Sequence, residues 1–432
     1  MSRPRPSRPR SSSSSRGALP CAVVADAAGN VSDWPDGAAT MRVGRRCVPI
    51  DPDDLIELPA GSELYALPGR TALAFTPERG LAPLDGQGAV AAFLPPCYSV
   101  FGLAAAQKES GAPLLPLYSY AAVCWWRGAF HVPAARVESD VKHDPAQFDA
   151  AAVAARVPER IAQNPGNRLV RHLGENCALR YGCANAKNLF LGRWECPIPI
   201  APACNAACIG CISAQPDAPI PSPQERLAFV PSVEEILEIA LPHLTSAPRA
   251  MLSFGQGCEG EPLLQADLMI ETIRKIREAT PRGTLHLNTN GSRPDAVLRL
   301  FRAGLDSIRV STNSARAQPY QAYYRPVGYG FDAVVQSLLA AKRHGGFASI
   351  NYLAFPGFTD GDEEVAALHQ LIERTGLDLI QWRNLNIDPD AYVEIVALQD
   401  DAPACGMRRL LATLRERWPR LRHGYLNPPS GE

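Results

Sequence analysis

The chain has 432 residues, 46% of them hydrophobic, with 43 Lys and Arg against 44 Asp and Glu. This length gives room for two or three domains, and the hydrophobic content supports a buried core. The near-neutral charge provides neither an overall basic surface for nucleic acid nor an acidic, solvating tail. No run of 18 or more apolar residues is present, so we expect no membrane span and no membrane partner.

The first half of the chain divides into three predicted segments. Residues 1–20 are rich in Arg, Pro and Ser and too poor in apolar residues to fold, which predicts a disordered basic tail. Residues 21–146 contain short apolar runs, among them Glu63–Leu67 and Ala72–Phe75, separated by Gly, Pro and Asp turns. This pattern predicts a β-rich N-terminal domain, whose role we cannot assign from any motif.

Residues 147–195 form a predicted connector that is first helical, over Gln147–Val170, and then contains cysteines. Cys177 and Cys183 lie six residues apart, and Cys196 follows at the edge of the next predicted strand. These three cysteines suggest a possible second Fe-S cluster, although buried structural thiols explain them equally well.

From residue 196 to residue 395 the chain alternates strand-like and helix-like segments, which is typical of a parallel α/β sheet. Residues 396–432 are predicted to form a C-terminal helix over Met407–Trp418 and a disordered tail from Asn427 onward. The strands are expected at Pro197–Ala201, Ala250–Gly255, Thr284–Asn290, Ser307–Thr312, Ser349–Phe355 and Leu379–Leu385. The intervening helices are expected at Val233–Leu244, Leu264–Ala279, Pro294–Ala303, Phe331–His344 and Asp362–Arg374.

Three of the 12 cysteines, Cys204, Cys208 and Cys211, have C-x3-C-x2-C spacing directly after the first of these strands. Three thiolates bind three irons of a cubane [4Fe-4S] cluster and leave the fourth iron open to a ligand. A structural zinc ion needs four ligands, usually in separated pairs, and a third neighbouring thiol argues against a disulfide pair. We therefore expect cytoplasmic thiols and a metal cluster here.

This cysteine motif resembles the signature of the radical SAM superfamily, in the style of the branch that contains the molybdenum cofactor biosynthesis cyclase. The resemblance implies a partial (β/α)6 TIM-like barrel that binds a [4Fe-4S] cluster and S-adenosylmethionine. It also implies reductive cleavage of S-adenosylmethionine to a 5′-deoxyadenosyl radical, which abstracts hydrogen from a substrate. A reductant such as flavodoxin or ferredoxin is implied as partner. The substrate is unknown and includes small molecules, peptides and RNA as candidates.

Further motifs at the ends of the predicted strands carry the same resemblance. Gly260 and Glu261 lie in Glu-Gly-Glu-Pro, which is similar to the family's Gly-Gly-Glu-Pro element, whose backbone binds the amino group of the cofactor. Thr289 lies in a Thr-Asn-Gly element that contacts the cofactor in that branch. Ser311 corresponds to a serine that binds the methionine carboxylate or the ribose, and Asn313 follows on the same side of the strand.

Two departures from the family pattern favour an alternative function. Gly210 stands where an aromatic residue usually covers the adenine, and Glu259 replaces the first glycine of the Gly-Gly-Glu-Pro element. The alternative is a non-catalytic Fe-S binding or redox-sensing protein on a degenerate radical SAM barrel.

Polar residues on the inward faces of the predicted strands suggest a solvated substrate cavity. Arg309 and Arg383 are candidates to hold a carboxylate or phosphate there, and the alternative pairs them with Glu261 or Asp388. Cys258 is either a hydrogen-atom donor to a substrate radical or a buried free thiol.

Overall fold

The computed structural model describes residues 19–215 and 220–429, so most of the predicted basic tail lies outside the described residues. The contacts divide the chain into two compact units. The first contains residues 19–139, 353–366 and 382–419, and the second contains residues 140–352, 367–381 and 420–429. None of the described helices is both long enough and apolar enough to cross a membrane.

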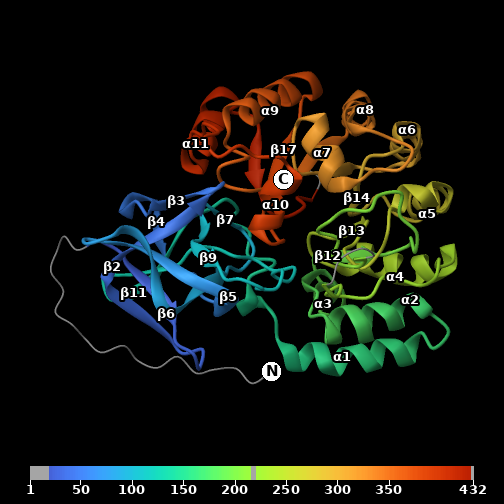
Figure 1. Ribbon diagram of the computed structural model, residues 1–432. Helices are drawn as coiled ribbons and strands as arrows, with labels where there is room; N and C mark the ends of the chain where they lie inside the picture. Colours follow the sequence, from blue (N-terminus) through green and yellow to red (C-terminus); the bar gives the residue numbers. More distant parts are fainter. Residues whose placement is uncertain (1–18, 216–219, 430–432) are drawn as a thin grey trace. The chain divides into compact units, whose positions relative to one another are not determined.

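In its described part, the first unit contains an eleven-stranded antiparallel sheet with the path β3-β2-β5-β6-β1-β10-β11-β4, to which β7, β8 and β9 pair at the sides (Figure 1). Two runs expected as separate strands are one strand, β5, because Gly69, with φ of +63°, lies where the register shifts instead of turning the chain. The strands are β1 (Cys21–Ala25), β2 (Val31–Val43), β3 (Arg46–Pro49), β4 (Leu55–Glu57), β5 (Glu63–Thr76), β6 (Gly80–Phe93), β7 (Tyr98–Val100), β8 (Leu103–Ala104), β9 (Ala106–Lys108), β10 (Cys124–Trp126) and β11 (Ala129–Arg136).

The same unit includes α10 (Pro389–Ile395) and α11 (Met407–Arg417), which a buried ion pair connects to the sheet. Arg70 on β5 and Asp388 at the N-cap of α10 are 3% and 2% exposed, and Arg70 Nη2 lies 2.9 Å from Asp388 Oδ2. The backbone N–H of Leu115 also donates to this carboxylate, at 2.9 Å. Charges this deeply buried stabilise a fold only while each one keeps its partners.

Among the described residues, the second unit is built on a seven-stranded sheet with the order β12-β13-β14-β15-β16-β17-β18. The strand pairs β12–β13, β13–β14, β14–β15, β15–β16 and β17–β18 are parallel. This sheet confirms the predicted α/β fold class, a partial barrel with a β-rich N-terminal domain. β18 extends the six predicted strands. The strands are β12 (Glu195–Ile198), β13 (Met251–Phe254), β14 (Thr284–Thr289), β15 (Ser307–Thr312), β16 (Phe347–Ala354), β17 (Leu379–Asn384) and β18 (Arg422–Gly424). The division into units passes through β16 and β17.

The helices between these strands lie on the outer side of the sheet (Figure 1). Ser232 and Glu235 form a capping box that starts α4, and Gly304, with φ of +116°, ends α6. The helices that follow the strands are α4 (Val233–Ser246), α5 (Ala266–Ala279), α6 (Pro294–Ala303), α7 (Ala317–Tyr324), α8 (Phe331–Arg343) and α9 (Asp362–Thr375).

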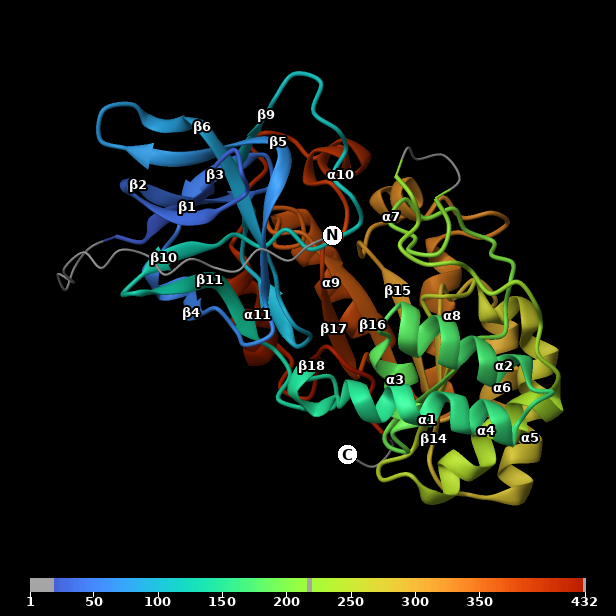
Figure 2. The same ribbon diagram turned by 90° about the horizontal axis from the view of Figure 1, so that it is seen from below.

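The connector is not the single helix that we expected over Gln147–Val170. Asn164-Pro165-Gly166 ends the first helix, because proline and glycine are poor residues inside a helix. Four helical segments result, namely α1 (Ala150–Gln163), α2 (Arg168–Arg171), a π-helix η3 (His172–Arg180) and α3 (Ala184–Phe190). Figure 2 shows α1, α2 and α3 beside α4.

The polar residues inside the parallel sheet are paired with one another, which corrects the expectation of a solvated cavity around Arg309. Arg309 Nη1 donates to Gln381 Oε1 at 2.8 Å and to Asn427 Oδ1 at 3.2 Å. Asn427, which we expected in a disordered tail, is 4% exposed and donates to Glu195 Oε1 at 3.1 Å. These two partners of Arg309 are neutral amides.

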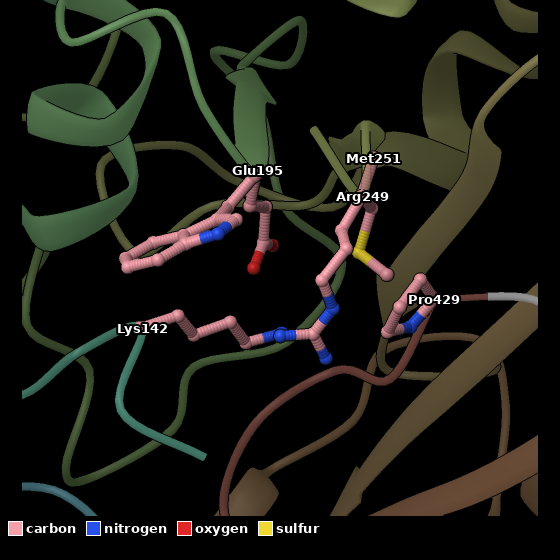
Figure 3. Close-up of a pocket in the computed structure, with 6 residues that line it drawn as sticks. Lys142, Glu195, Arg249, Met251 and Pro429 are labelled. Carbon is pink, nitrogen blue, oxygen red and sulfur yellow. The ribbon is translucent and has the colours of Figure 1, made fainter. Parts of the chain in front are cut away.

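The N-terminal ends of β12 and β13 are closed by side chains from separate segments. Figure 3 shows Lys142, Glu195, Arg249, Met251 and Pro429 around one small pocket at this end. Burial opposes ionisation of Glu195, but the charges of Lys142 and His143 outweigh it and lower the pKa of this carboxyl. This end of the sheet therefore has a structural role.

We predict that Arg70→Met lowers the stability of the first unit by about 3–5 kcal/mol, because Asp388 would remain buried without its cation. The measurement is the free energy of unfolding from urea titration. The matched control is Arg79→Met, because the Arg79–Asp85 pair is exposed and 3.9 Å long. We expect a change of less than about 0.5 kcal/mol for this control. Equal stability of the two variants would contradict the importance of the buried pair.

Candidate functional site

The loop with the three predicted ligand cysteines follows β12, at the end of the sheet where parallel α/β proteins place their catalytic loops. Its backbone is held by the end of α7: the N–H groups of Ala207 and Ile209 donate to the carbonyls of Tyr324 and Tyr323, both at 3.1 Å. Tyr323 and Tyr324 thus support the cysteine loop through their backbone carbonyls.

The three thiols share one partly buried environment. Burial raises the pKa of Cys204 to about 11, and the charge of Glu261 adds to this rise. Burial also raises the pKa of Cys208, as do the neighbouring Cys204 and Cys211. The three thiols therefore lie close enough for Cys204 and Cys211 to influence the ionisation of Cys208.

One guanidinium lies at this group of thiols. Arg226 Nη2 is 3.5 Å from Cys211 Sγ, and Arg226 Nε donates to Ser213 Oγ at 3.2 Å. A cation beside a sulfur favours the thiolate, which is the form that binds a metal. The role of Arg226 could not be predicted from the sequence, because this residue lies 15 residues after Cys211 and outside any motif.

Gly260 packs directly against the start of the cysteine loop. A Cβ atom at this position would lie 2.0 Å from the carbonyl oxygen of Ala203, so only glycine fits without moving the backbone. Gly260 N donates to Ala201 O at 2.6 Å, and Glu261 N donates to Ala203 O at 2.9 Å. The loop after β13 therefore forms a short ladder with the segment that precedes Cys204.

Glu259 accepts hydrogen bonds from two loops of the site, although the sequence analysis identified it only as a departure from the family pattern. Its carboxylate accepts hydrogen bonds from the backbone N–H groups of Ile200, Ala201 and Gln256, at 2.7, 2.8 and 2.6 Å. The side chain is 4% exposed, and burial raises its pKa to about 8. Glu259 thus connects the chain after β12 to the chain after β13.

Glu261 and Thr289 lie together as predicted cofactor contacts, but their side chains form a hydrogen bond with one another. The Thr289 hydroxyl donates to Glu261 Oε1, and the backbone N–H of Asn290 donates to Oε2 at 2.7 Å. Burial raises the pKa of Glu261 to about 7. Asn290 Nδ2 in turn donates to Asn205 Oδ1 in the cysteine loop at 2.8 Å. The ends of β13 and β14 are therefore connected to the loop by polar contacts.

The other two predicted cofactor contacts differ in exposure. Ser311 is half-buried at the end of β15, opposite Asn351 on β16. Asn313, which precedes α7, is completely buried, and its Nδ2 donates to the carbonyl of Pro319 in the first turn of α7 at 3.2 Å. Of this pair, Ser311 is the residue with an accessible side chain.

The structure does not group Cys196 with Cys177 and Cys183. The Cys196 thiol is fully buried and contacts the carbonyl of its own neighbour Pro197, at 4.0 Å. Cys177 instead lies against Cys258, with the two sulfur atoms 3.7 Å apart. The expected set of Cys177, Cys183 and Cys196 is therefore wrong in one member, because strand β12 directs Cys196 into the core.

Parallel strands that end beside a loop of three cysteines and a buried Glu-Gly-Glu-Pro turn define a partial-barrel α/β enzyme. Residues 198–369 match the family model described as the radical SAM superfamily. These residues, less than half of the chain, therefore form a radical SAM domain, and the general chemistry of that superfamily is the radical cleavage of S-adenosylmethionine.

Several solved structures resemble the chain loosely, and no curated protein sequence matches it. Methylornithine synthase is 15% identical, with a TM-score of 0.38 over 63% of this chain and 78% of that one. HydG from Carboxydothermus hydrogenoformans is 12% identical, with a TM-score of 0.36 over 64% and 70%. SuiB from Streptococcus suis bound to S-adenosylmethionine is 14% identical, with a TM-score of 0.37 over 62% and 55%.

We predict that Gly260→Ala destabilises the second unit by at least about 1–3 kcal/mol, because backbone atoms, not a flexible side chain, occupy the space of the new methyl group. Urea titration measures the loss. Gly166→Ala is the control, because no atom lies within 4 Å of the corresponding position on an exposed turn. A harmless Gly260→Ala would contradict the close approach of the two loops.

We also predict that Glu259→Gln destabilises the same unit. The amide presents an NH2 group where one carboxylate oxygen now accepts, so at least one buried backbone donor loses its acceptor, at a cost of about 1–3 kcal/mol. The measurement is again the free energy of unfolding. Glu278→Gln on the exposed face of α5 makes the same chemical change without buried partners and is expected to be neutral.

Proposed function

We propose that the protein binds a [4Fe-4S] cluster through Cys204, Cys208 and Cys211 and uses it to generate a 5′-deoxyadenosyl radical that abstracts hydrogen from a substrate. The observation that supports this function best is the loop of three converging thiols at the C-terminal end of β12, within a radical SAM domain. Three thiolates complete the coordination of three irons and leave one iron open for the cofactor.

When bound, the cluster and S-adenosylmethionine supply a one-electron reduction that yields methionine and the 5′-deoxyadenosyl radical. The electron comes from a small reductant of the flavodoxin or ferredoxin class in our proposal. None of the twelve cysteines, all of which are among the described residues, forms a disulfide. This agrees with the reducing conditions of the cytoplasm, where we place the reaction.

The residues around the thiols have distinct roles in this proposal. Arg226 holds Cys211 in position by its hydrogen bond to the sulfur. Gly260 and Glu261 hold the cysteine loop by their backbone contacts to Ala201 and Ala203, and they border the cofactor. The accessible hydroxyl of Ser311 suits a carboxylate or ribose oxygen of S-adenosylmethionine, since it adds no charge.

Thr289 and Asn313 act less directly in this proposal than the sequence suggests. The Thr289 hydroxyl donates to Glu261, so its contribution is to fix the Glu-Gly-Glu-Pro turn. The Asn313 amide donates to Pro319 O and thereby sets the start of α7, whose last residues support the cysteine loop. Both residues remain part of the proposed cofactor site as positioning residues.

We predict that anaerobically reconstituted, dithionite-reduced protein releases 5′-deoxyadenosine and methionine from S-adenosylmethionine. Cys208→Ala should abolish this release, because the cluster would lose one of its three thiolates. Liquid chromatography with mass spectrometry measures both products, and iron content is measured in parallel.

Cys47→Ala is the matched control, since Cys47 is a half-buried thiol on β3, outside the cysteine loop. We expect it to keep both the iron and the activity. A cluster that forms normally but never cleaves S-adenosylmethionine would favour the non-catalytic alternative. Activity that survives Cys208→Ala would refute the proposed ligands.

A further inference from the structure

We propose a second metal site, a zinc site whose protein ligands are His172, Cys177 and Cys258. One imidazole nitrogen and the two sulfur atoms all lie within 4.8 Å of one another, and all three residues are buried. Imidazole and thiolate are the ligands that zinc prefers in proteins. The site is separate from the three cysteines of the proposed cluster, so it does not rest on the proposed function.

The distance between the two sulfur atoms fits one tetrahedral ion. Two thiolates on the same zinc, each about 2.3 Å from it, are about 3.8 Å apart in a tetrahedral arrangement. Cys177 Sγ and Cys258 Sγ are 3.7 Å apart.

The π-helix η3 places His172 and Cys177 together. A π-helix has more residues per turn than an α-helix, so residues five apart lie closer to the same side than they do in an α-helix. In an α-helix, with 3.6 residues per turn, a spacing of five would separate the two side chains by about 140°. π-Helical turns are rare and occur frequently at functional sites.

His172 has one ring nitrogen paired and one that suits a metal. The Asn176 amide lies 3.3 Å from Nδ1. The buried Nε2 atom makes no hydrogen bond of normal geometry among the described residues, the His172 ring interacts with the Cys258 thiol, and His172 is only 9% exposed. A buried nitrogen without a partner is costly unless a ligand satisfies it. Metal binding through Nε2 requires Nδ1 to keep its proton and donate it, so the Asn176 amide would turn to present its oxygen to Nδ1 in place of its NH2 group.

Cys183 lies next to Cys177 in the fold, because its backbone N–H donates to the Cys177 carbonyl at 2.8 Å, at the start of α3. Its thiol is not one of the three ligand atoms that lie within 4.8 Å of one another, so a water molecule or a shift of this thiol would fill the fourth position of a tetrahedral ion. Zinc displaces the proton of each thiol that binds it, so binding releases one proton per cysteine ligand.

A metal at this position would hold the loop that supports the cysteine loop. Cys258 directly precedes Glu259 and Gly260, and its carbonyl accepts from Leu227 N at 2.7 Å. The ion would therefore connect the connector helix η3 to the turn after β13. This gives Cys258 a structural role in place of hydrogen-atom donation.

The first test is the metal content of the full-length protein, measured by inductively coupled plasma mass spectrometry. We expect about one zinc per chain, both in the natural protein and in the triple variant Cys204→Ala, Cys208→Ala, Cys211→Ala. Because the triple variant cannot bind the proposed cluster, zinc retained there separates this proposal from the proposed function. Cys258→Ser should lose the zinc, whereas Cys196→Ala, which removes a buried thiol outside the site, should keep it.

Cobalt substitution of the natural protein tests the same ligands without relying on the folding of a variant. A tetrahedral site with thiolates gives a sulfur-to-cobalt charge-transfer band and intense d–d bands, which added zinc removes. Three outcomes overturn the proposal: absence of zinc with both thiols reduced, a Cys177–Cys258 disulfide in peptide mapping, or additional iron that survives in the triple variant.

Discussion

The carboxylate of Glu259 is the interaction on which the site depends most. It accepts three backbone hydrogen bonds from two loops that follow neighbouring strands, and it is almost completely buried. Without it, the chain between β12 and Cys204 would have buried donors and no acceptors. The position of the cysteine loop thus depends on an acidic side chain whose three hydrogen bonds come from backbone N–H groups and not from the thiols.

A buried acid at this position also explains why the loop after β13 tolerates a departure from a glycine pair. Gly260 must remain small because Ala203 lies against it, but Glu259 directs its side chain toward Ile200 and Ala201. The same turn therefore combines one residue chosen for the absence of a side chain with one chosen for its acceptor atoms. Glu261 adds a third requirement, because it connects the turn to β14.

The sequence predicted the parallel part of the fold well because local patterns determine it. Ser307–Thr312 and Pro294–Ala303 were expected with the bounds that the structure has, since an apolar run and a proline and glycine mark their ends. The predictions failed where contacts are long-range. Asn427 looks like a residue of a polar tail, and only the folded chain brings it to Glu195, 232 residues earlier.

The second group of cysteines shows the same limit for the site. Spacing along the chain grouped Cys196 with Cys177, but Cys196 lies on the fully buried strand β12, where its sulfur contacts the carbonyl of Pro197. Cys258, 81 residues from Cys177, is its actual neighbour. The π-helix that brings His172 to the same point has no sequence pattern that distinguishes it from an α-helix. Metal sites assembled from separate loops therefore become visible only when the backbone conformation is known, whereas a single-loop motif such as Cys204 to Cys211 is visible in the sequence.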